Sequence, residues 1–244
     1  MEPQLAPMGW NGDGRAATPR GPTLGAWLRA LGVLSATVLV HEAAHAVAAR
    51  RAGGRVQEVG IGFGPRLLTR EVGGTTISLR PFLVGGFAAI DIEGLPPHRR
   101  IPVLLAGPLA NLLLGLLLLP RRISPEVRRT MAVERRYGGA RGPRVQLAGI
   151  VGALGLLLRA GTPESLRVLA AQINLSVGLA NLLPLAPLDG GHLALAQMEA
   201  RGVPEGGRLL FRHTTAVVFF WLLLHIFLND LRRLLGQSGS PSSS

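Results

Sequence analysis

The segment His41-Glu42-Ala43-Ala44-His45 lies inside one hydrophobic run, and the segment Asn181-Leu-Leu-Pro184-Leu-Ala-Pro187-Leu-Asp189-Gly190-Gly191 ends another. On a helix, residues four apart share one face, so the two imidazoles point the same way with a carboxylate beside them. The second segment supplies an aspartate where an apolar stretch stops. Imidazole and carboxylate are the ligands that catalytic zinc sites use, with one position left for water. We therefore predict a zinc site with His41, His45 and Asp189 as ligands and Glu42 as the general base.

The hydrophobic residues are distributed as in a membrane protein. They make up 48% of the 244-residue chain and concentrate in blocks instead of spreading as in a soluble core. The block 101–119 contains no charged residue. A helix of that length spans about 28 Å at ~1.5 Å per residue, close to the thickness of the hydrocarbon core. The sequence therefore predicts a multi-pass protein of the cell membrane, embedded in the lipid bilayer.

The metal site restricts the topology, because its ligands must lie at one depth in the membrane. The two histidines lie near the C-terminal end of the first predicted span, and Asp189 lies at the C-terminal end of the third. These ends can meet only if the two helices run in the same direction, which leaves one span between them. We thus predict a mainly α-helical membrane protein with about four transmembrane helices, a membrane-associated β-hairpin region and one interfacial helix.

The predicted segments form one domain at 23–235. Its spans are placed at 24–48, 101–119, 168–188 and 212–229, its β-region at 56–92 and its interfacial helix at 145–158. The Pro- and Gly-rich segment 1–22 and the Ser-rich segment 236–244 are expected to be disordered tails.

Charge and cysteine content exclude several classes of function. The formal net charge is +12 and all 26 basic residues are arginines, but aromatic residues make up only 5%, so we expect no nucleic-acid partner. The arginines flank the hydrophobic blocks, as expected for side chains among anionic lipid headgroups. The chain has no cysteine, which excludes disulfides and thiolate ligands and leaves His, Asp and Glu for a metal.

The sequence allows other roles for the two histidines and for the aspartate. The two histidines could serve helix packing, although polar side chains within an apolar span are costly unless they are partnered or functional. Asp91 and Glu93, in the strand-like region, are alternative third ligands. Asp189 is favoured because the prolines before it and the glycines after it free the backbone to turn it inward. Asp189 could also cap a following helix.

Together with Gly107-Pro-Leu-Ala-Asn111 in the second span, these two motifs resemble the site-2 protease family of intramembrane zinc metalloproteases. The likeness includes Gly62-Phe63-Gly64-Pro65 and Leu83-Val84-Gly85-Gly86-Phe87, which look like that family's membrane-embedded β-hairpin. It covers about residues 24–230 in the right order. The resemblance implies one zinc ion per chain, held by His41, His45 and Asp189, with Glu42 as the catalytic base of peptide hydrolysis.

The resemblance also implies roles for residues around the metal. Asn181 would contact the substrate backbone, with a helix–helix hydrogen bond as its alternative role. Gly85 and Gly86 would belong to the substrate-binding hairpin. Close packing around the site would involve Gly107, Asn111, Pro184, Pro187, Gly190 and Gly191. Many bacterial members carry a PDZ domain or a nucleotide-sensing domain, which neither the loop 120–144 nor the C-terminal tail can hold. We therefore expect a separate regulatory protein.

The function implied is regulated intramembrane proteolysis of single-span membrane proteins, with the zinc nearer the cytoplasmic face. Charge counting does not decide the orientation, because residues 50–100 and 121–144 each contain eight arginines. Expected substrates are an anti-sigma factor, a membrane-tethered regulator or a signal-peptide remnant, trimmed first by another protease. The alternative is a catalytically inactive scaffold that binds transmembrane helices; the retained Glu42 argues against it. A zinc transporter is disfavoured because the polar candidates cluster at one depth.

Overall fold

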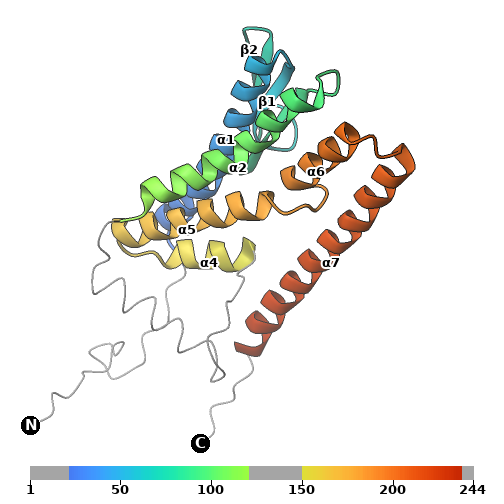
Figure 1. Ribbon diagram of the computed structural model, residues 1–244. Coiled ribbons are helices and arrows are strands. Elements are labelled where there is room, and N and C mark those ends of the chain that lie inside the picture. The colour runs from blue at the N-terminus through green and yellow to red at the C-terminus, as the bar shows by residue number, and fades with distance from the viewer. Residues whose placement is uncertain (1–21, 121–149, 238–244) are drawn as a thin grey trace, which may run out of the picture.

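The computed structural model describes residues 22–120 and 150–237, and it consists of helices packed beside one small sheet (Figure 1). The helices are α1 (Leu24–Ala52), α2 (Pro97–Leu118), α4 (Ile150–Arg159), α5 (Pro163–Asn181), α6 (Asp189–Ala200) and α7 (Glu205–Gln237). The strands are β1 (Arg55–Phe63), β2 (Leu68–Val72), β3 (Thr75–Leu79) and β4 (Phe82–Asp91). The predicted tails at 1–22 and 236–244 lie outside the described residues, except that residue 22 precedes α1 and residues 236–237 belong to α7, which corrects the predicted start of the second tail. The predicted loop at 121–144 and the start of the predicted interfacial helix, at 145–149, also lie outside the described residues.

Three helices of the described chain are long and apolar enough to cross a membrane: Leu24–Ala52, Pro97–Leu118 and Glu205–Asn229. They correspond to the first, second and fourth predicted spans. The third predicted span corresponds to α5, which has 19 residues but is not among these three helices. The protein is therefore a helical membrane protein, whereas the count of four spans stays a prediction.

Helix α5 differs from its prediction at both ends. It begins after Thr162, whose hydroxyl accepts from the backbone N–H of Ser165 in a capping box, and it ends at Asn181. The predicted helix up to residue 188 is wrong. Proline disfavours helical geometry in the residue before it, so Pro184 and Pro187 keep the segment 182–188 in turns.

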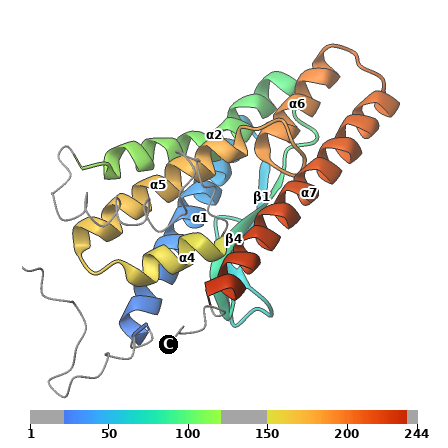
Figure 2. The same cartoon turned by 90° about the horizontal axis from the view of Figure 1, so that it is seen from below.

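Helices α1, α2 and α5 form the packed centre, and α2 runs antiparallel to the other two (Figures 1 and 2). The start of α5 meets the end of α2, where Arg167 donates to the carbonyl of Leu118. Halfway along, the buried amide of Asn174 donates to the hydroxyl of Thr37 at 3.0 Å and joins α5 to α1. The first and third predicted spans thus run in the same direction, as the shared depth of the ligands requires.

The segment predicted as a β-hairpin is a four-stranded sheet in the order β2-β3-β1-β4. Strand β1 pairs in parallel with β3 and antiparallel with β4, while β2 and β3 form a hairpin. Gly73 and Gly74 both have positive φ in that turn, which glycine adopts without strain. The single hairpin was therefore too simple a prediction. Strand β4 lies at the edge of the sheet and packs against α1.

Two helices lie outside this centre. Helix α4 contacts α1, α5 and α7 and lies beside α5 in both views, and its predicted interfacial position stays a prediction. Helix α7 runs along one side of the molecule, with its main contacts to α6 and α4 (Figures 1 and 2). Its side chains are mostly exposed, including Phe220 and Trp221, as expected for a helix that faces lipid.

Candidate metal centre

Helix α1 presents two imidazoles on the face that packs against α2. His41 and His45 are both buried, and their Nε2 atoms lie 3.1 Å apart. Thr23 caps the start of this helix and Gly53, with φ of 90°, ends it in the left-handed conformation, so both histidines lie in the interior of one continuous helix. One regular helix therefore fixes the relative position of both rings.

A tight turn directs Asp189 toward these rings. A Cβ atom at Gly190 would overlap the carbonyl oxygens of Leu182 and Leu183, and one at Gly191 would lie 2.6 Å from the backbone nitrogen of Ala186. Only glycine allows the first turn of α6 to pack this closely on the turn before it. Asp189, the first residue of α6, consequently reaches α1 from the far side of the cavity.

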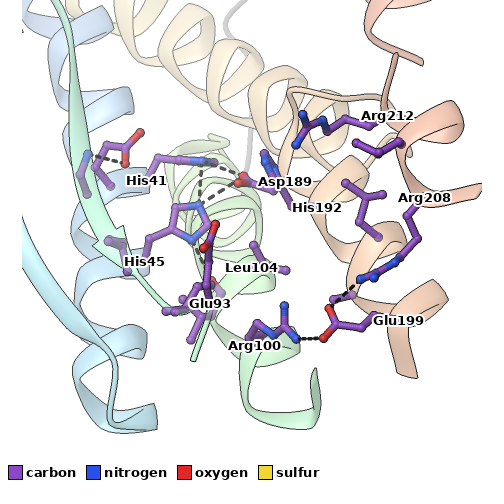
Figure 3. Close-up of a pocket in the computed structure, with 18 of the residues that line it drawn as sticks. His41, His45, Glu93, Arg100, Leu104, Asp189, His192, Glu199, Arg208 and Arg212 are labelled. Carbon is purple, nitrogen blue, oxygen red and sulfur yellow. Dashed lines mark hydrogen bonds and ion pairs between the residues drawn. The ribbon is translucent and has the colours of Figure 1, made fainter. Parts of the chain in front are cut away.

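The three side chains converge on one point (Figure 3). Oδ2 of Asp189 lies 3.0 Å from Nε2 of His41 and 3.2 Å from Nε2 of His45. A tetrahedral zinc ion with bonds of about 2.0–2.1 Å separates its ligand atoms by roughly 3.3 Å. In addition, no N–H group of the described residues meets the buried Oδ2 in hydrogen-bonding geometry. A buried oxygen without a donor, beside two ring nitrogens, fits a ligand of a metal ion.

Helix α2 leaves room for both rings at Gly107. A Cβ atom there would lie 2.8 Å from Cε1 of His41 and would overlap Nε2 of His45. The sequence prediction that Gly107 allows close packing agrees with this contact. The same helix holds the second ring, because Nδ1 of His45 lies 2.7 Å from the carbonyl oxygen of Val103.

Glu42 lies beside the candidate metal ligands but is not one of them. Its Oε2 accepts from the backbone N–H of Ala88 in β4 at 2.9 Å. Because β1 pairs with the opposite side of β4, this N–H lies on the free edge of the sheet. The carboxylate and the free edge of β4 therefore face the same cavity, which has a volume of about 830 Å³ and is also lined by His41, His45 and Asp189.

The alternative third ligands lie elsewhere. Glu93 lines the cavity, but the group that could hold a metal among the described residues contains only His41, His45 and Asp189. Asp91 ends β4, where it pairs with Arg55 of β1, and does not line the cavity. The geometry thus favours Asp189.

Other residues predicted near the site do not line the cavity. The amide of Asn181 donates to the carbonyl of Val177 within its own helix. Gly85, with φ of 152°, packs against Phe63, and a Cβ atom at Gly86 would lie 2.7 Å from the carbonyl oxygen of Gly60. These two glycines allow close approach within the sheet. Pro184 and Pro187 lie in the turn before α6, with a cis peptide bond before Pro187.

The sequence analysis missed an ionic cluster on the cavity wall, formed by Arg100, Glu199 and Arg208. Glu199 of α6 accepts from Arg100 of α2 at 2.6 Å and lies 3.5 Å from Arg208 of α7. The guanidinium of Arg100 holds the pKa of Glu199 below its usual value. Arg100 is 99 residues from Glu199 in the chain, so no local sequence pattern could have indicated the cluster.

Comparison with known proteins assigns the family. The profile of peptidase family M50 matches residues 29–224, which include every residue of the candidate metal centre. The chain belongs to peptidase family M50. This membership confirms the resemblance to site-2 proteases that the motifs indicated.

Several individual relatives carry provisional names as zinc metalloproteases. One is the protein named Rip3 of Mycobacterium tuberculosis, 31% identical over 186 residues, which cover 74% of this chain and 34% of that protein. A Chlamydia pneumoniae protein is 35% identical over 111 residues, covering 36% of this chain and 17% of that protein. A Nostoc protein is 36% identical over 107 residues, covering 38% and 29%. The chain thus spans about a third or less of the length of these relatives.

Proposed function

We propose that this chain is a zinc metalloprotease that hydrolyses peptide bonds within or near the transmembrane segments of single-span membrane proteins. The observation that carries the proposal is the convergence of His41, His45 and Asp189 beside Glu42, on helices of a membrane protein. Membership of peptidase family M50 supports the same chemistry. One zinc ion per chain fits the ligand set.

The metal ligands, Glu42 and the cavity lining would have different roles in hydrolysis. Zinc held by the three ligands would lower the pKa of a water molecule and polarise the scissile carbonyl. Glu42, which neighbours the ligands without joining them, would take a proton from the attacking water and pass it to the leaving amine. The cavity is lined on one part by apolar residues, including Ile90, Leu104 and Leu195, and on another by charged residues, including Arg100 and Glu199, along which water would reach the site.

Strand β4 would hold the substrate in extended form. A peptide bond inside an intact helix is shielded by hydrogen bonds, so hydrolysis requires local unwinding. The free edge of β4 offers backbone groups to an added strand, and Ala88, Ile90 and Ile92 line the cavity in alternation. A substrate carbonyl that accepts from Ala88 would replace Glu42 there and release its carboxylate for the attacking water.

The biological setting follows from the family resemblance. We propose a multi-pass position in the cell membrane with the metal nearer the cytoplasmic face, and substrates such as an anti-sigma factor or a membrane-tethered regulator that another protease has trimmed. A separate protein would regulate the activity.

The test is Glu42→Gln in full-length protein, with zinc content and cleavage of a single-span substrate measured on the same preparation. General acid–base catalysis typically contributes 10²–10⁴-fold, so we expect a rate loss of that order with zinc retained. Glu71→Gln changes an exposed carboxylate on β2 and should leave both readouts unchanged. A wild type that binds zinc but cleaves nothing, or a variant as active as the wild type, would favour the scaffold that binds helices.

A further inference from the structure

Helix α2 contacts each imidazole at the nitrogen that faces away from Asp189. Nδ1 of His45 lies 2.7 Å from the carbonyl oxygen of Val103, and Nδ1 of His41 lies 3.2 Å from the side-chain amide of Asn111. Helix α2 thus contacts the Nδ1 atoms of both rings, while their Nε2 atoms face the carboxylate of Asp189.

The protonation of a neutral imidazole links its two nitrogens. One nitrogen carries the proton and the other carries the lone pair that binds a metal. A carbonyl oxygen can only accept, so Val103 requires the proton of His45 on Nδ1 and leaves Nε2 free for zinc. His41 can bind through Nε2 only if its own Nδ1 is protonated and meets an acceptor.

The side chain of Asn111 offers both an acceptor and a donor at this place. It is completely buried, its Nδ2 faces His41, and its Oδ1 has no hydrogen-bond partner among the described residues. The two ends of an amide have nearly the same size, so packing does not choose between them. A half-turn of the amide places the unpartnered Oδ1 against Nδ1 of His41, where it accepts the proton that zinc binding requires.

We propose that Asn111 is a positioning residue, whose carbonyl oxygen accepts from Nδ1 of His41 and so holds the Nε2 lone pair toward the metal. The proposal rests on the zinc centre of the proposed function and adds an orienting residue to it. It differs from the sequence prediction, which placed close helix packing ahead of a direct role in catalysis for Asn111. Hydrogen bonds behind metal-binding histidines commonly strengthen metal affinity 10–100-fold.

The decisive comparison is Asn111→Asp against Asn111→Leu, with zinc affinity measured in full-length protein by competition with a chelator. Aspartate can only accept, so it should hold zinc as tightly as the wild type or more tightly. Leucine, of similar volume, should weaken zinc binding by about 10–100-fold. If Asn111 instead donates to Nδ1, aspartate should weaken binding at least as much as leucine, and that result would overturn the proposal.

Asn174 provides a matched control, because it is equally buried in α5 and its Oδ1 also lacks a partner in the described structure, but it bonds to Thr37 and to no ligand. Asn174→Asp and Asn174→Leu should change thermal stability. Zinc affinity should not differ between these two variants as it does between Asn111→Asp and Asn111→Leu. Equal zinc affinity in wild type and Asn111→Leu would leave Asn111 as a packing residue. A wild type that binds no zinc would remove the zinc centre and this proposal together.

The wild type itself gives a second measurement if the variants do not fold. In zinc-loaded protein with ¹⁵N-labelled histidines, the Nδ1 proton of His41 should exchange with solvent as slowly as that of His45. Fast exchange at His41 alone would show that it lacks an acceptor and would contradict the role of Asn111.

Discussion

A Cβ atom added at Gly107 would overlap Nε2 of His45, one of the two ring nitrogens that face Asp189. We predict that Gly107→Ala displaces the rings and lowers zinc content from about one ion per chain to well below half. Metal analysis of detergent-purified protein measures this. Gly32→Ala in α1 is the matched control, since a Cβ atom there meets nothing within 4 Å. Full zinc content in the Gly107 variant would mean that the rings can move aside.

Removal of the third ligand should abolish stable zinc binding. In Asp189→Ala the two imidazoles remain, but a site with two protein ligands binds zinc far more weakly than one with three. Zinc content after dialysis against a weak chelator is the measurement. Asp91→Asn and Glu93→Gln should retain the ion, because neither residue joins the metal-binding group. Zinc kept in the Asp189 variant and lost in one of these two variants would identify Asp91 or Glu93 as the third ligand.

If a substrate binds as an added strand on β4, its affinity should depend on every second backbone N–H group of the substrate. In an extended peptide, successive N–H groups point to opposite sides, so only every second one can pair with an edge strand. A series of peptides with one N-methyl group each should show inhibition constants that rise about tenfold at alternate positions and change little at the others. A uniform effect along the peptide would contradict binding as an added strand.

The buried carboxylate of Glu58 should make stability depend on pH. It accepts from Arg66, from Ser78 at 2.6 Å and from Arg80 at 2.9 Å. These bonds, that from Arg66 foremost, lower the pKa of Glu58 from about 4.5 to about 2. Because the pKa is lower in the folded state, the stabilisation is fully present above pH 4.5 and is lost as pH falls toward 2.

Glu58→Gln should therefore lower the Tm at neutral pH by on the order of 5 °C and flatten the fall in Tm between pH 5 and pH 2. Thermal unfolding followed by circular dichroism in detergent checks both effects. Glu71→Gln, at an exposed carboxylate of the same sheet, should change neither. A parallel shift of the whole pH curve would assign the acid sensitivity to other groups.

The ionic cluster on the cavity wall should restrain α7. Glu199 joins α2 and α7 through Arg100 and Arg208, and a hydrogen bond from Ala186 to Thr215 adds a contact farther along α7. Glu199→Gln should broaden the distance distribution between spin labels at the exposed positions 113 and 217. Arg201→Gln, which removes a charge from the same end of α6, is the control. Unchanged distributions in the Glu199 variant would show that packing alone holds α7.

Part of the site follows directly from the sequence. Helical spacing places His41 and His45 on one face with Glu42 beside them, whatever the rest of the fold does. The sequence also indicated a turn before Asp189, because prolines precede it and glycines follow it, although the predicted span ran to residue 188 and α5 ends at Asn181. Local backbone chemistry determines both features, so a sequence pattern can carry them.

The sheet was predicted only in outline. The alternating residues between 56 and 79 indicated strands, but the parallel pairing of β1 with β3 joins two strands that β2 separates in the chain. Likewise, the roles of Val103 and Asn111 behind the imidazoles depend on the register of α2 against α1. Side-chain packing between distant segments sets that register, and no local spacing encodes it.

The sequence by itself determined the membrane character, the two imidazoles with their neighbouring carboxylate and the backbone turn before Asp189. Each of these depends on composition, on helical periodicity or on the geometry of proline and glycine. The tertiary structure decided which carboxylate joins the histidines, which groups hold the far side of each ring and which edge of the sheet faces the cavity. Those are distances between segments far apart in the chain, and they are fixed only when α1, α2, α6 and β4 pack together.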